Sequence, residues 1–306
     1  MKEIVILSGK GGTGKTSIAA SFAVLASSKV LADCDVDAPD LHLLLKPVPR
    51  ESGEFWGMSK AAIDPRLCTG CGLCAEVCRF GAIAARSGAP QPGKKRAGTF
   101  AVDPLSCEGC GFCTRACPVQ AARLVDNLAG QWFISDTDYG PLVHARLGVA
   151  EENSGKLVAT VKKMAREEAR RLALNTIIVD GPPGLGCPVI SSLSGACSAL
   201  IVTEPTLSGK HDLERTVGLA QHFGVPAFAC INKFDIDAEN AREIERFCDS
   251  RGVPVLARVP FDDAVTGAIV ARVPLVEYSR GRAAREIARL WLELERLAPD
   301  RQSGGN

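Results

Sequence analysis

Short runs of apolar residues, separated by longer amphipathic segments, dominate the hydrophobic pattern of this chain. Such runs are typical of strands that are buried on both faces of a parallel sheet. They lie at residues 4–7, 30–32, 176–179, 199–203, 227–231 and 255–259. The segments between them predict helices at 15–28, 154–172, 208–222, 238–250 and 281–297. This alternation predicts an α/β fold with a mostly parallel sheet and helices on both faces.

The alternation is interrupted at residues 60–125, where cysteine and glycine replace the regular pattern. Because α/β character resumes afterwards, we expect a small inserted α+β domain there. The main domain would then be discontinuous, comprising residues 1–59 and 126–299. Within it, Trp132–Ile134 and Leu142–Val143 predict the strands of a hairpin. Residues 300–306 predict a disordered tail.

Composition and charge narrow the classes of function. The chain has 306 residues, with 36 Lys and Arg against 35 Asp and Glu, a balance that argues against direct nucleic-acid binding. No apolar run approaches the roughly 18 residues of a membrane span, and residues 4–7 are too short for the core of a signal peptide. We therefore expect a soluble cytoplasmic protein. The apolar stripe of 281–297 is expected to pack on the protein's own sheet, without membrane binding.

Residues 9–16 fit the phosphate-binding pattern G-x-x-x-x-G-K-[ST], and they lie between a predicted strand and a predicted helix. The glycines of such a loop let backbone N–H groups surround phosphates. Lys15 would neutralise the β- and γ-oxygens, and Thr16 would bind Mg²⁺. The predicted nucleotide-binding residues here are Gly9, Lys10, Gly11, Gly12, Thr13, Gly14, Lys15, Thr16 and Ser17.

Acidic residues end two of the predicted strands, at the edge of the sheet where α/β proteins bind ligands. Asp33 and Asp35 follow the strand at 30–32, and Asp180 precedes a Gly-Pro-Pro-Gly segment. Aspartates in such positions either lie near Mg²⁺ or only cap helices. The glycines after Asp180 would let that loop move with the terminal phosphate.

Eight of the 13 cysteines form two copies of the bacterial ferredoxin run C-x₂-C-x₂-C-x₃-C. In that arrangement three cysteines of a run bind one cubane, and the fourth binds the other. One [4Fe–4S] cluster would then take Cys68, Cys71, Cys74 and Cys117, and the other would take Cys107, Cys110, Cys113 and Cys78. Zinc is the alternative, but zinc modules separate two C-x₂-C pairs by a longer spacer.

Lys10 adds a second lysine to the phosphate loop, which reads Lys-Gly-Gly-Thr-Gly-Lys-Thr. The loop thereby resembles that of the deviant Walker A P-loop ATPases, the superfamily of MinD, ParA, Mrp and the nitrogenase iron protein. With its cysteine runs, the chain resembles the members of that superfamily that carry an inserted ferredoxin domain with two [4Fe–4S] clusters. The resemblance covers nearly the whole chain and includes the segments that begin at Asp180 and Thr203.

The resemblance implies catalytic roles for Lys10, Lys15 and Asp35. Lys10 would reach across a dimer to the partner's nucleotide, where a cation stabilises the charge on the transferred phosphoryl group. Asp35 would orient or activate the attacking water. These roles come from the resemblance and not from the spacing of the residues.

The resemblance also implies the residues that hold the metal and the base. Thr16, Asp33 and Asp180 would lie around Mg²⁺. Asn232 would bond to the purine, and Pro260 belongs to a segment that would flank the base on its other side.

We therefore expect an iron–sulfur P-loop ATPase that hydrolyses Mg-ATP in a nucleotide-dependent dimer, slowly without its partner. Two [4Fe–4S] clusters would couple ATP to electron transfer or to redox-dependent partner binding. The dimer would be a homodimer or a heterodimer with a paralogue. A redox partner or a small NifX- or NifB-like cluster-binding protein would be a further partner.

Two alternatives remain open. One is a nucleotide switch for spatial organisation or complex assembly, as in MinD and ParA. The other is an iron–sulfur carrier or scaffold like Mrp, although the chain has no late C-x₂-C pair after Cys117.

Overall fold

The chain divides into two compact units. The computed structural model describes residues 1–86, 98–148, 151 and 154–300. The first unit comprises Met1–Gly53, Gln131–Arg146 and Ser154–Asn306, and the second comprises Glu54–Gly130 and Leu147–Asn153. The second unit is therefore longer at both ends than the predicted insertion, and it includes a separate later segment. Of the predicted tail, residues 301–306 lie outside the described residues.

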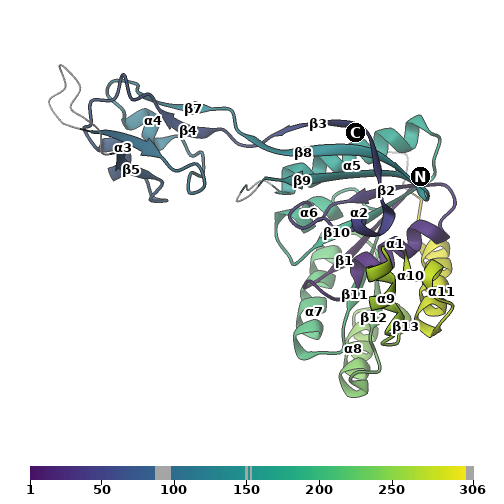
Figure 1. Cartoon of the computed structure of the whole chain (residues 1–306). Coiled ribbons are helices and arrows are strands. Elements are labelled where there is room, and N and C mark those ends of the chain that lie inside the picture. Colours follow the sequence, from purple (N-terminus) through teal and green to yellow (C-terminus); the bar gives the residue numbers. More distant parts are fainter. Residues whose placement is uncertain (87–97, 149–150, 152–153, 301–306) are drawn as a thin grey trace. The chain divides into compact units, whose positions relative to one another are not determined.

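A nine-stranded sheet organises the first unit, counted over the described residues, in the order β13-β12-β11-β1-β10-β2-β9-β8-β3 (Figure 1). Every pairing from β13 to β9 is parallel, which confirms the predicted mostly parallel α/β sheet. The strands are β1 (Lys2–Ser8), β2 (Lys29–Asp33), β3 (Val48–Trp56), β8 (Leu128–Thr137), β9 (Gly140–Leu147), β10 (Thr176–Pro183), β11 (Ser198–Thr203), β12 (Ala227–Asn232) and β13 (Val255–Val259).

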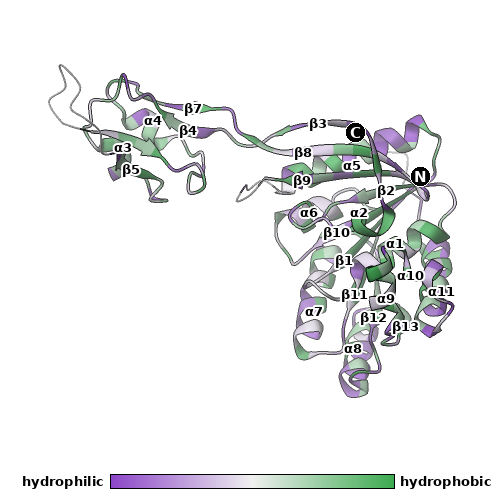
Figure 2. Cartoon of the chain, viewed as in Figure 1, coloured by the Kyte–Doolittle hydropathy of each residue, from purple (hydrophilic) through white to green (hydrophobic). Residues whose placement is uncertain are grey.

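Helices cover both faces of this sheet (Figure 1). One apolar core joins the sheet to α1, α2, α9, α10 and α11, and a second core joins it to α7 and α8. Both hydrophilic and hydrophobic residues occur along α7, α8 and α11, as is typical of amphipathic helices (Figure 2). The helices are α1 (Lys15–Leu25), α2 (Leu41–Leu45), α5 (Ser154–Arg171), α6 (Cys187–Leu193), α7 (Leu207–His222), α8 (Ala238–Ser250), α9 (Ala264–Ala271), α10 (Leu275–Tyr278) and α11 (Arg282–Leu297).

The apolar stripe of α11 packs inside the first unit. Ile287, Leu290, Trp291 and Leu294 are at most 2% exposed. The Trp291 ring lies 5.0 Å from that of Phe22 on α1, measured between centroids. The stripe therefore belongs to the core, as the sequence predicted. No helix within the described parts of the chain is both long enough and apolar enough to cross a membrane.

The second unit repeats one small motif. Each cysteine run lies in a strand–helix–strand segment, and the strands of the two segments pair with each other. β4 pairs with β7 and β5 pairs with β6, both antiparallel. The first segment contains β4 (Lys60–Ile63), α3 (Leu73–Glu76) and β5 (Ile83–Arg86), and the second contains β6 (Thr99–Val102), α4 (Phe112–Ala116) and β7 (Ala122–Val125).

The burial of α11 leads to a first prediction. Trp291→Ala should lower the free energy of unfolding by about 3–5 kcal/mol, because it empties a well-packed site between α11 and α1. Chemical denaturation followed by circular dichroism measures the change.

Leu292→Ala is the matched control, since Leu292 lies on the same helix but is 63% exposed. That variant should change stability by no more than about 0.5 kcal/mol. Equal effects of the two substitutions would contradict the docking of α11.

Candidate functional site

Parallel pairing brings the phosphate loop and the acidic strand ends to one edge of the sheet. Asp180 on β10 stands in register with Ile6 of β1 on one side and with Asp33 of β2 on the other. The phosphate loop begins directly after β1 and ends where α1 begins at Lys15. Residues far apart in sequence therefore meet because their strands run in the same direction.

The backbone of the phosphate loop depends on glycine. Gly12 and Gly14 have φ angles of 79° and 89°, in the left-handed region that other residues rarely adopt. A Cβ on Gly14 would also lie 2.3 Å from the Asn232 Nδ2 atom. Between these glycines, the Thr13 hydroxyl is buried and has no hydrogen-bond partner among the described residues. A buried polar atom without a partner suits a loop that receives a polar ligand.

A buried ammonium group stands at the centre of the site. The Lys15 Nζ atom lies 2.6 Å from the Asp180 Oδ1 atom and 3.9 Å from the Asp35 Oδ2 atom. The Thr16 hydroxyl donates to the Asp180 Oδ2 atom at 2.8 Å. Burial by itself would lower the pKa of Lys15, but Asp180 and the neighbouring carboxylates raise it above its usual value. Lys15 therefore stays charged although it is only 6% exposed.

The two aspartates after β2 have different surroundings. Asp33 is fully buried and accepts backbone N–H groups of Asp35 at 3.1 Å and Leu41 at 3.2 Å. Burial, with Asp180 nearby, raises its pKa well above the usual value. Burial also raises the pKa of Asp35 to about 6, against the lowering effect of Lys15. Asp33 thus stabilises the loop after β2 through its backbone hydrogen bonds, whereas Asp35 lines the cavity over the site.

A large cavity of about 1920 Å³, counted with the open space at its mouth, lies over these groups. Its lining includes Asp35, Asn232 and the Pro260–Phe261 segment. The predicted site residues that line it are Gly11, Gly12, Thr13, Gly14, Lys15, Thr16, Ser17, Asp35, Asn232 and Pro260. Asp180 contacts the site through Lys15 and Thr16, while Gly9 packs closely against Asp212 of α7.

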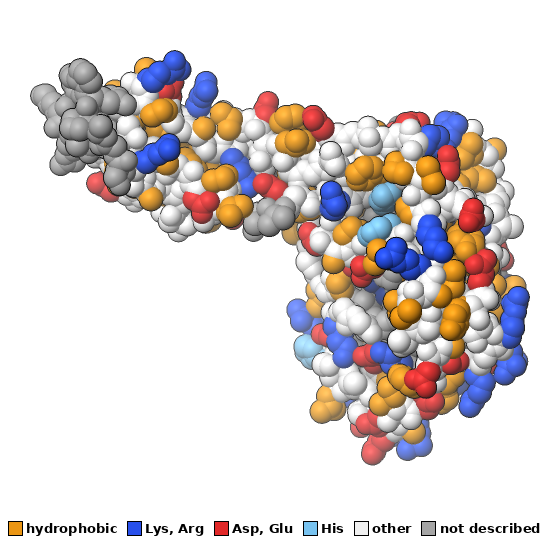
Figure 3. All heavy atoms as spheres, viewed as in Figure 1, with side chains coloured by type: hydrophobic (Ala, Val, Ile, Leu, Met, Phe, Trp, Pro, Cys, Tyr) orange, Lys and Arg blue, Asp and Glu red, His pale blue; other side chains and the backbone are white. Residues whose placement is uncertain are grey.

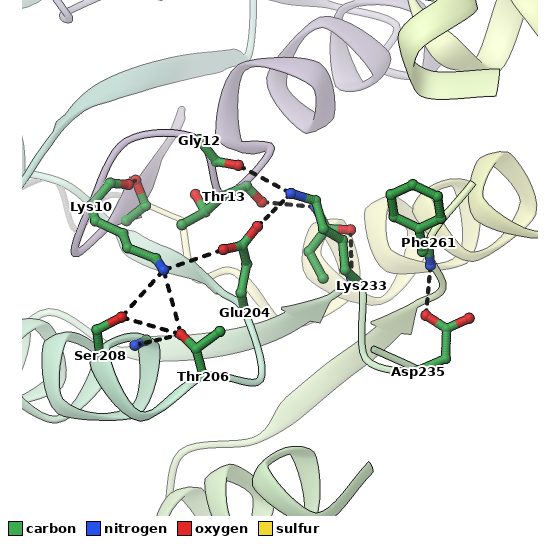
Figure 4. A network of polar contacts seen from close by, with 12 residues as sticks. Lys10, Gly12, Thr13, Glu204, Thr206, Ser208, Lys233, Asp235 and Phe261 are labelled. Carbon is green, nitrogen blue, oxygen red and sulfur yellow. Dashed lines mark hydrogen bonds and ion pairs between the residues drawn. The ribbon is translucent and has the colours of Figure 1, made fainter. Parts of the chain in front are cut away.

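The second lysine of the loop is bound within its own chain (Figure 4). The Lys10 Nζ atom lies 3.4 Å from the Glu204 Oε2 atom and hydrogen-bonds to the hydroxyls of Thr206 and Ser208. Glu204 also pairs with Lys233, whose Nζ atom donates to the Gly12 carbonyl at 3.3 Å. Sequence reasoning had given Glu204 and Lys233 no role. Their charged side chains directly after predicted strands were the available signal.

Each predicted cysteine quartet lines one pocket in the second unit. Cys68, Cys71, Cys74 and Cys117 line one small pocket, and Cys78, Cys107, Cys110 and Cys113 line another. All eight thiols are free. Among the described residues, no three His, Cys, Asp or Glu side chains form a site for a single metal ion. In the space-filling view, apolar side chains lie between charged ones on the visible face of this unit (Figure 3).

The backbone around these cysteines provides space and hydrogen bonds. Gly72 and Gly111 have φ angles of 87° and 74°, and each lines one of the pockets. The Cys107 sulfur accepts the Ala61 N–H group at 3.4 Å, and the Cys117 sulfur accepts the Ala121 N–H group at 3.2 Å. Burial opposes ionisation of Cys117, but several backbone N–H groups outweigh it and lower its pKa. Burial instead raises the pKa of Cys74 and of Cys113, one in each quartet, so these two thiols would lose their protons on binding a metal.

Comparison with known proteins identifies the family. The family described as "CobQ/CobB/MinD/ParA nucleotide binding domain" matches residues 4–275. The chain belongs to this family. P-loop proteins of the MinD and ParA type in this family are nucleotide-binding ATPases.

Individual proteins are similar to this chain to different extents. The uncharacterized protein MJ0578 of Methanocaldococcus jannaschii is 31% identical over 296 residues, or 96% of each chain. The iron-sulfur cluster carrier protein of Pyrococcus abyssi is 27% identical over 145 residues, 43% of this chain and 48% of that one. The structure of the septum site-determining protein MinD with Mg-ADP from Pyrococcus horikoshii shares the fold, with a TM-score of 0.57, 17% identity and 97% of each chain covered.

The conformation of the family's phosphate loop leads to a second prediction. Gly14→Ala should weaken Mg-ADP binding by at least about tenfold, because the new Cβ displaces the Asn232 amide and the left-handed backbone becomes strained. Isothermal titration calorimetry measures the affinity.

Gly11→Ala is the matched control in the same loop, since a Cβ there would meet no described atom within 4 Å. It should bind Mg-ADP within about threefold of the unsubstituted chain. A large loss in Gly11→Ala with none in Gly14→Ala would show that the close approach to Asn232 does not matter.

Proposed function

We propose that this protein is a nucleotide-dependent ATPase that couples Mg-ATP binding and hydrolysis to two [4Fe–4S] clusters. The observation that carries the proposal is the placement of each cysteine quartet around its own pocket, in a chain whose other unit holds a complete phosphate-loop site. The clusters would supply one-electron chemistry when bound. Family membership supports nucleotide binding, and the two pockets support the binding of clusters.

In the nucleotide half, the residues around Lys15 would act as a switch. A bound triphosphate would compete with Asp180 for the Lys15 ammonium, because both present negative oxygens to it. Release of the Asp180 carboxylate would leave it, with the Thr16 hydroxyl, to bind Mg²⁺. The loop that follows Asp180 would change position as a consequence. Asp35, which faces the cavity, would orient the attacking water.

Lys10 would act only after its side chain is released from its contacts within its own chain. In the structure its ammonium is held by Glu204 and two hydroxyls, all on the same chain. A second chain that carries a nucleotide would offer Lys10 a triphosphate in place of one carboxylate, which favours transfer of the contact. We therefore expect hydrolysis to require a dimer, either of identical chains or with a paralogue.

A short chain segment would link the nucleotide switch to the cysteine unit. Within the first unit, Gly155 at the start of α5 packs tightly on α6, where a Cβ would lie 3.3 Å from Cys187 and Ser191 atoms. Within the second unit, Glu151 forms an ion pair with Lys60 at 3.0 Å and accepts from Asn127 at 2.7 Å.

The contacts on either side of this segment support the proposed coupling. α6 follows the loop after Asp180, and the residue after Lys60 donates to the Cys107 sulfur. Three residues in the sequence separate Glu151, which contacts Lys60 and Asn127, from Gly155, which packs on α6. A shift of α6 would therefore pull on a segment that is bound beside a proposed cluster ligand.

The cytoplasm is the compartment we propose, because low-potential clusters and free thiols persist in reducing surroundings. A small cluster-binding or redox protein is the proposed further partner. A second function, delivery of clusters, is favoured by the likeness to the iron-sulfur cluster carrier protein over 43% of the chain. Transfer of iron and sulfide to an apo-ferredoxin would distinguish delivery from electron transfer.

The cluster assignment predicts which cysteine substitutions remove the same cluster. Cys71→Ala and Cys117→Ala should remove the same electron paramagnetic resonance signal, and Cys110→Ala and Cys78→Ala should remove the other. Each should lower the iron content from about eight to about four per chain. Anaerobic reconstitution, iron analysis and spectroscopy of the reduced protein provide the measurement.

Cys187→Ala should keep both signals and serves as the control, since this exposed cysteine lies outside the second unit. If Cys117→Ala removed the same signal as Cys110→Ala, the fourth cysteine of each run would not bind the cluster of the other run. Retention of iron by all five variants would refute the cluster assignment.

Coupling predicts that Mg-ATP shifts at least one cluster potential by about 59 mV or more, equivalent to a tenfold change in equilibrium constant. Redox titration with and without Mg-ATP measures it. Gly155→Ala should reduce the shift, because it forces the start of α5 away from α6.

Gly218→Ala on α7 is the matched control, since a Cβ there meets no described atom within 4 Å. It should leave the shift intact. If Mg-ATP left both cluster potentials of the unsubstituted protein unchanged, coupling would be refuted. If the shift were as large in Gly155→Ala, the contact between α5 and α6 would not carry the coupling.

A further inference from the structure

The two pockets of the second unit have equivalent thiols but different charges. We name them the Cys68 pocket and the Cys107 pocket, after the first cysteine of the run that supplies three of the four thiols. Counted over the described residues, Glu108 is the one Asp, Glu, Lys or Arg that lines the Cys107 pocket. Its equivalent in the other run is Thr69, and no such charged residue among those described lines the Cys68 pocket.

The charge of Glu108 has no cation beside it. Within the second unit, the described side chains form two ion pairs, Lys60 with Glu151 and Arg66 with Asp64. Neither pair includes Glu108, which is exposed and directly follows the first cysteine of its run. Water screens such a carboxylate but does not neutralise it, so a negative charge remains at one pocket and not at the other.

A second pair of equivalent residues has the same asymmetry. Asp64 and Asp103 each lie four residues before the first cysteine of a run. Asp64 pairs with Arg66 at 3.2 Å. Asp103 instead accepts from two neutral groups, the Ser106 hydroxyl at 2.6 Å and the Leu105 N–H group at 3.0 Å. Leu105 stands where the other run has Arg66, so the chain that leads to the Cys107 pocket lacks this positive charge.

Hydrogen bonds to sulfur act in the same direction. In the Cys68 pocket, the Cys117 sulfur accepts the Ala121 N–H group at 3.2 Å, and further backbone N–H groups stabilise its thiolate. The Cys107 sulfur accepts the Ala61 N–H group at the longer distance of 3.4 Å. Donors directed at sulfur stabilise the more negative, reduced form of a cluster, and a nearby carboxylate destabilises that form.

We infer that Glu108 lowers the reduction potential of the cluster in the Cys107 pocket below that of the cluster in the Cys68 pocket. The inference rests on the proposed function, since it needs both clusters. A first electron from a low-potential one-electron donor then rests in the Cys68 pocket. Transfer between the pockets oxidises one cluster and reduces the other, with no bond made or broken. The stronger reductant is thus the cluster beside Ala61, which follows the Lys60 that pairs with Glu151.

Two variants of the full chain give one potential each in a mediated redox titration, with dithionite as the reductant. Cys71→Ala keeps the cluster of the Cys107 pocket, and Cys110→Ala keeps that of the Cys68 pocket. The potential in Cys71→Ala should be the lower by at least about 28 mV, a threefold difference in equilibrium constant for one electron. Adding Glu108→Gln to Cys71→Ala should raise that potential by at least the same factor. Glu108→Asp should keep most of the lower potential, because it keeps the charge.

Two further substitutions make the result specific. Thr69→Glu, added to Cys110→Ala, should lower the potential of the Cys68 pocket by a similar factor. Asp126→Asn is the matched control and should change neither potential, since this exposed aspartate after β7 lines neither pocket. Equal potentials in the two cysteine variants, or equal effects of Glu108→Gln and Glu108→Asp, overturn the inference and leave the cluster assignment intact. Absence of iron from the reconstituted, unsubstituted protein overturns both.

Discussion

Three carboxylates converge on one buried ammonium group, and the chemistry of the first unit depends on that imbalance. Asp33, Asp35 and Asp180 lie around Lys15 at the ends of parallel strands. One cation cannot compensate three anions in a buried place. Burial, with the Asp180 charge nearby, raises the pKa of Asp33 and of Asp35. A triphosphate alone would worsen the imbalance of charge. A divalent cation would relieve it, so this site favours nucleotide and Mg²⁺ together.

The sequence predicted the elements whose residues are buried on both sides and failed where burial is partial. β1 and β10 are continuous apolar runs because helices cover both faces of the sheet. β3 was missed, since nearly all its side chains are exposed at the edge and its Arg50, Glu51 and Gly53 show no alternation. α9 was also missed, because its run from Ala264 to Ala271 is almost entirely apolar and has no helical periodicity. Motifs predicted the phosphate loop, but only tertiary structure shows that Lys10 and Lys233 share Glu204.

The topology of the second unit explains why the fourth cysteine of each run belongs with the other run. β4 precedes Cys68, and β7 follows Cys117. Because β4 and β7 pair antiparallel, the start of one run lies beside the end of the other. The antiparallel pairing of β5 with β6 likewise places Cys78, at the end of the first run, beside Cys107, at the start of the second. The proposed exchange of ligands would thus follow from how the two strand–helix–strand segments pair with each other.

Glu204 connects the phosphate loop with the end of β12, since it pairs with Lys10 from the loop and with Lys233 directly after the strand. Lys233 also binds the Gly12 carbonyl, and the preceding Asn232 binds that of Thr13. A base bound beside Asn232 would, under the proposed function, draw Lys233 away from Glu204. More of the carboxylate's negative charge would then remain for Lys10, whose release would become harder. Base binding would in this way keep Lys10 on Glu204 until the triphosphate of a partner chain competes for it.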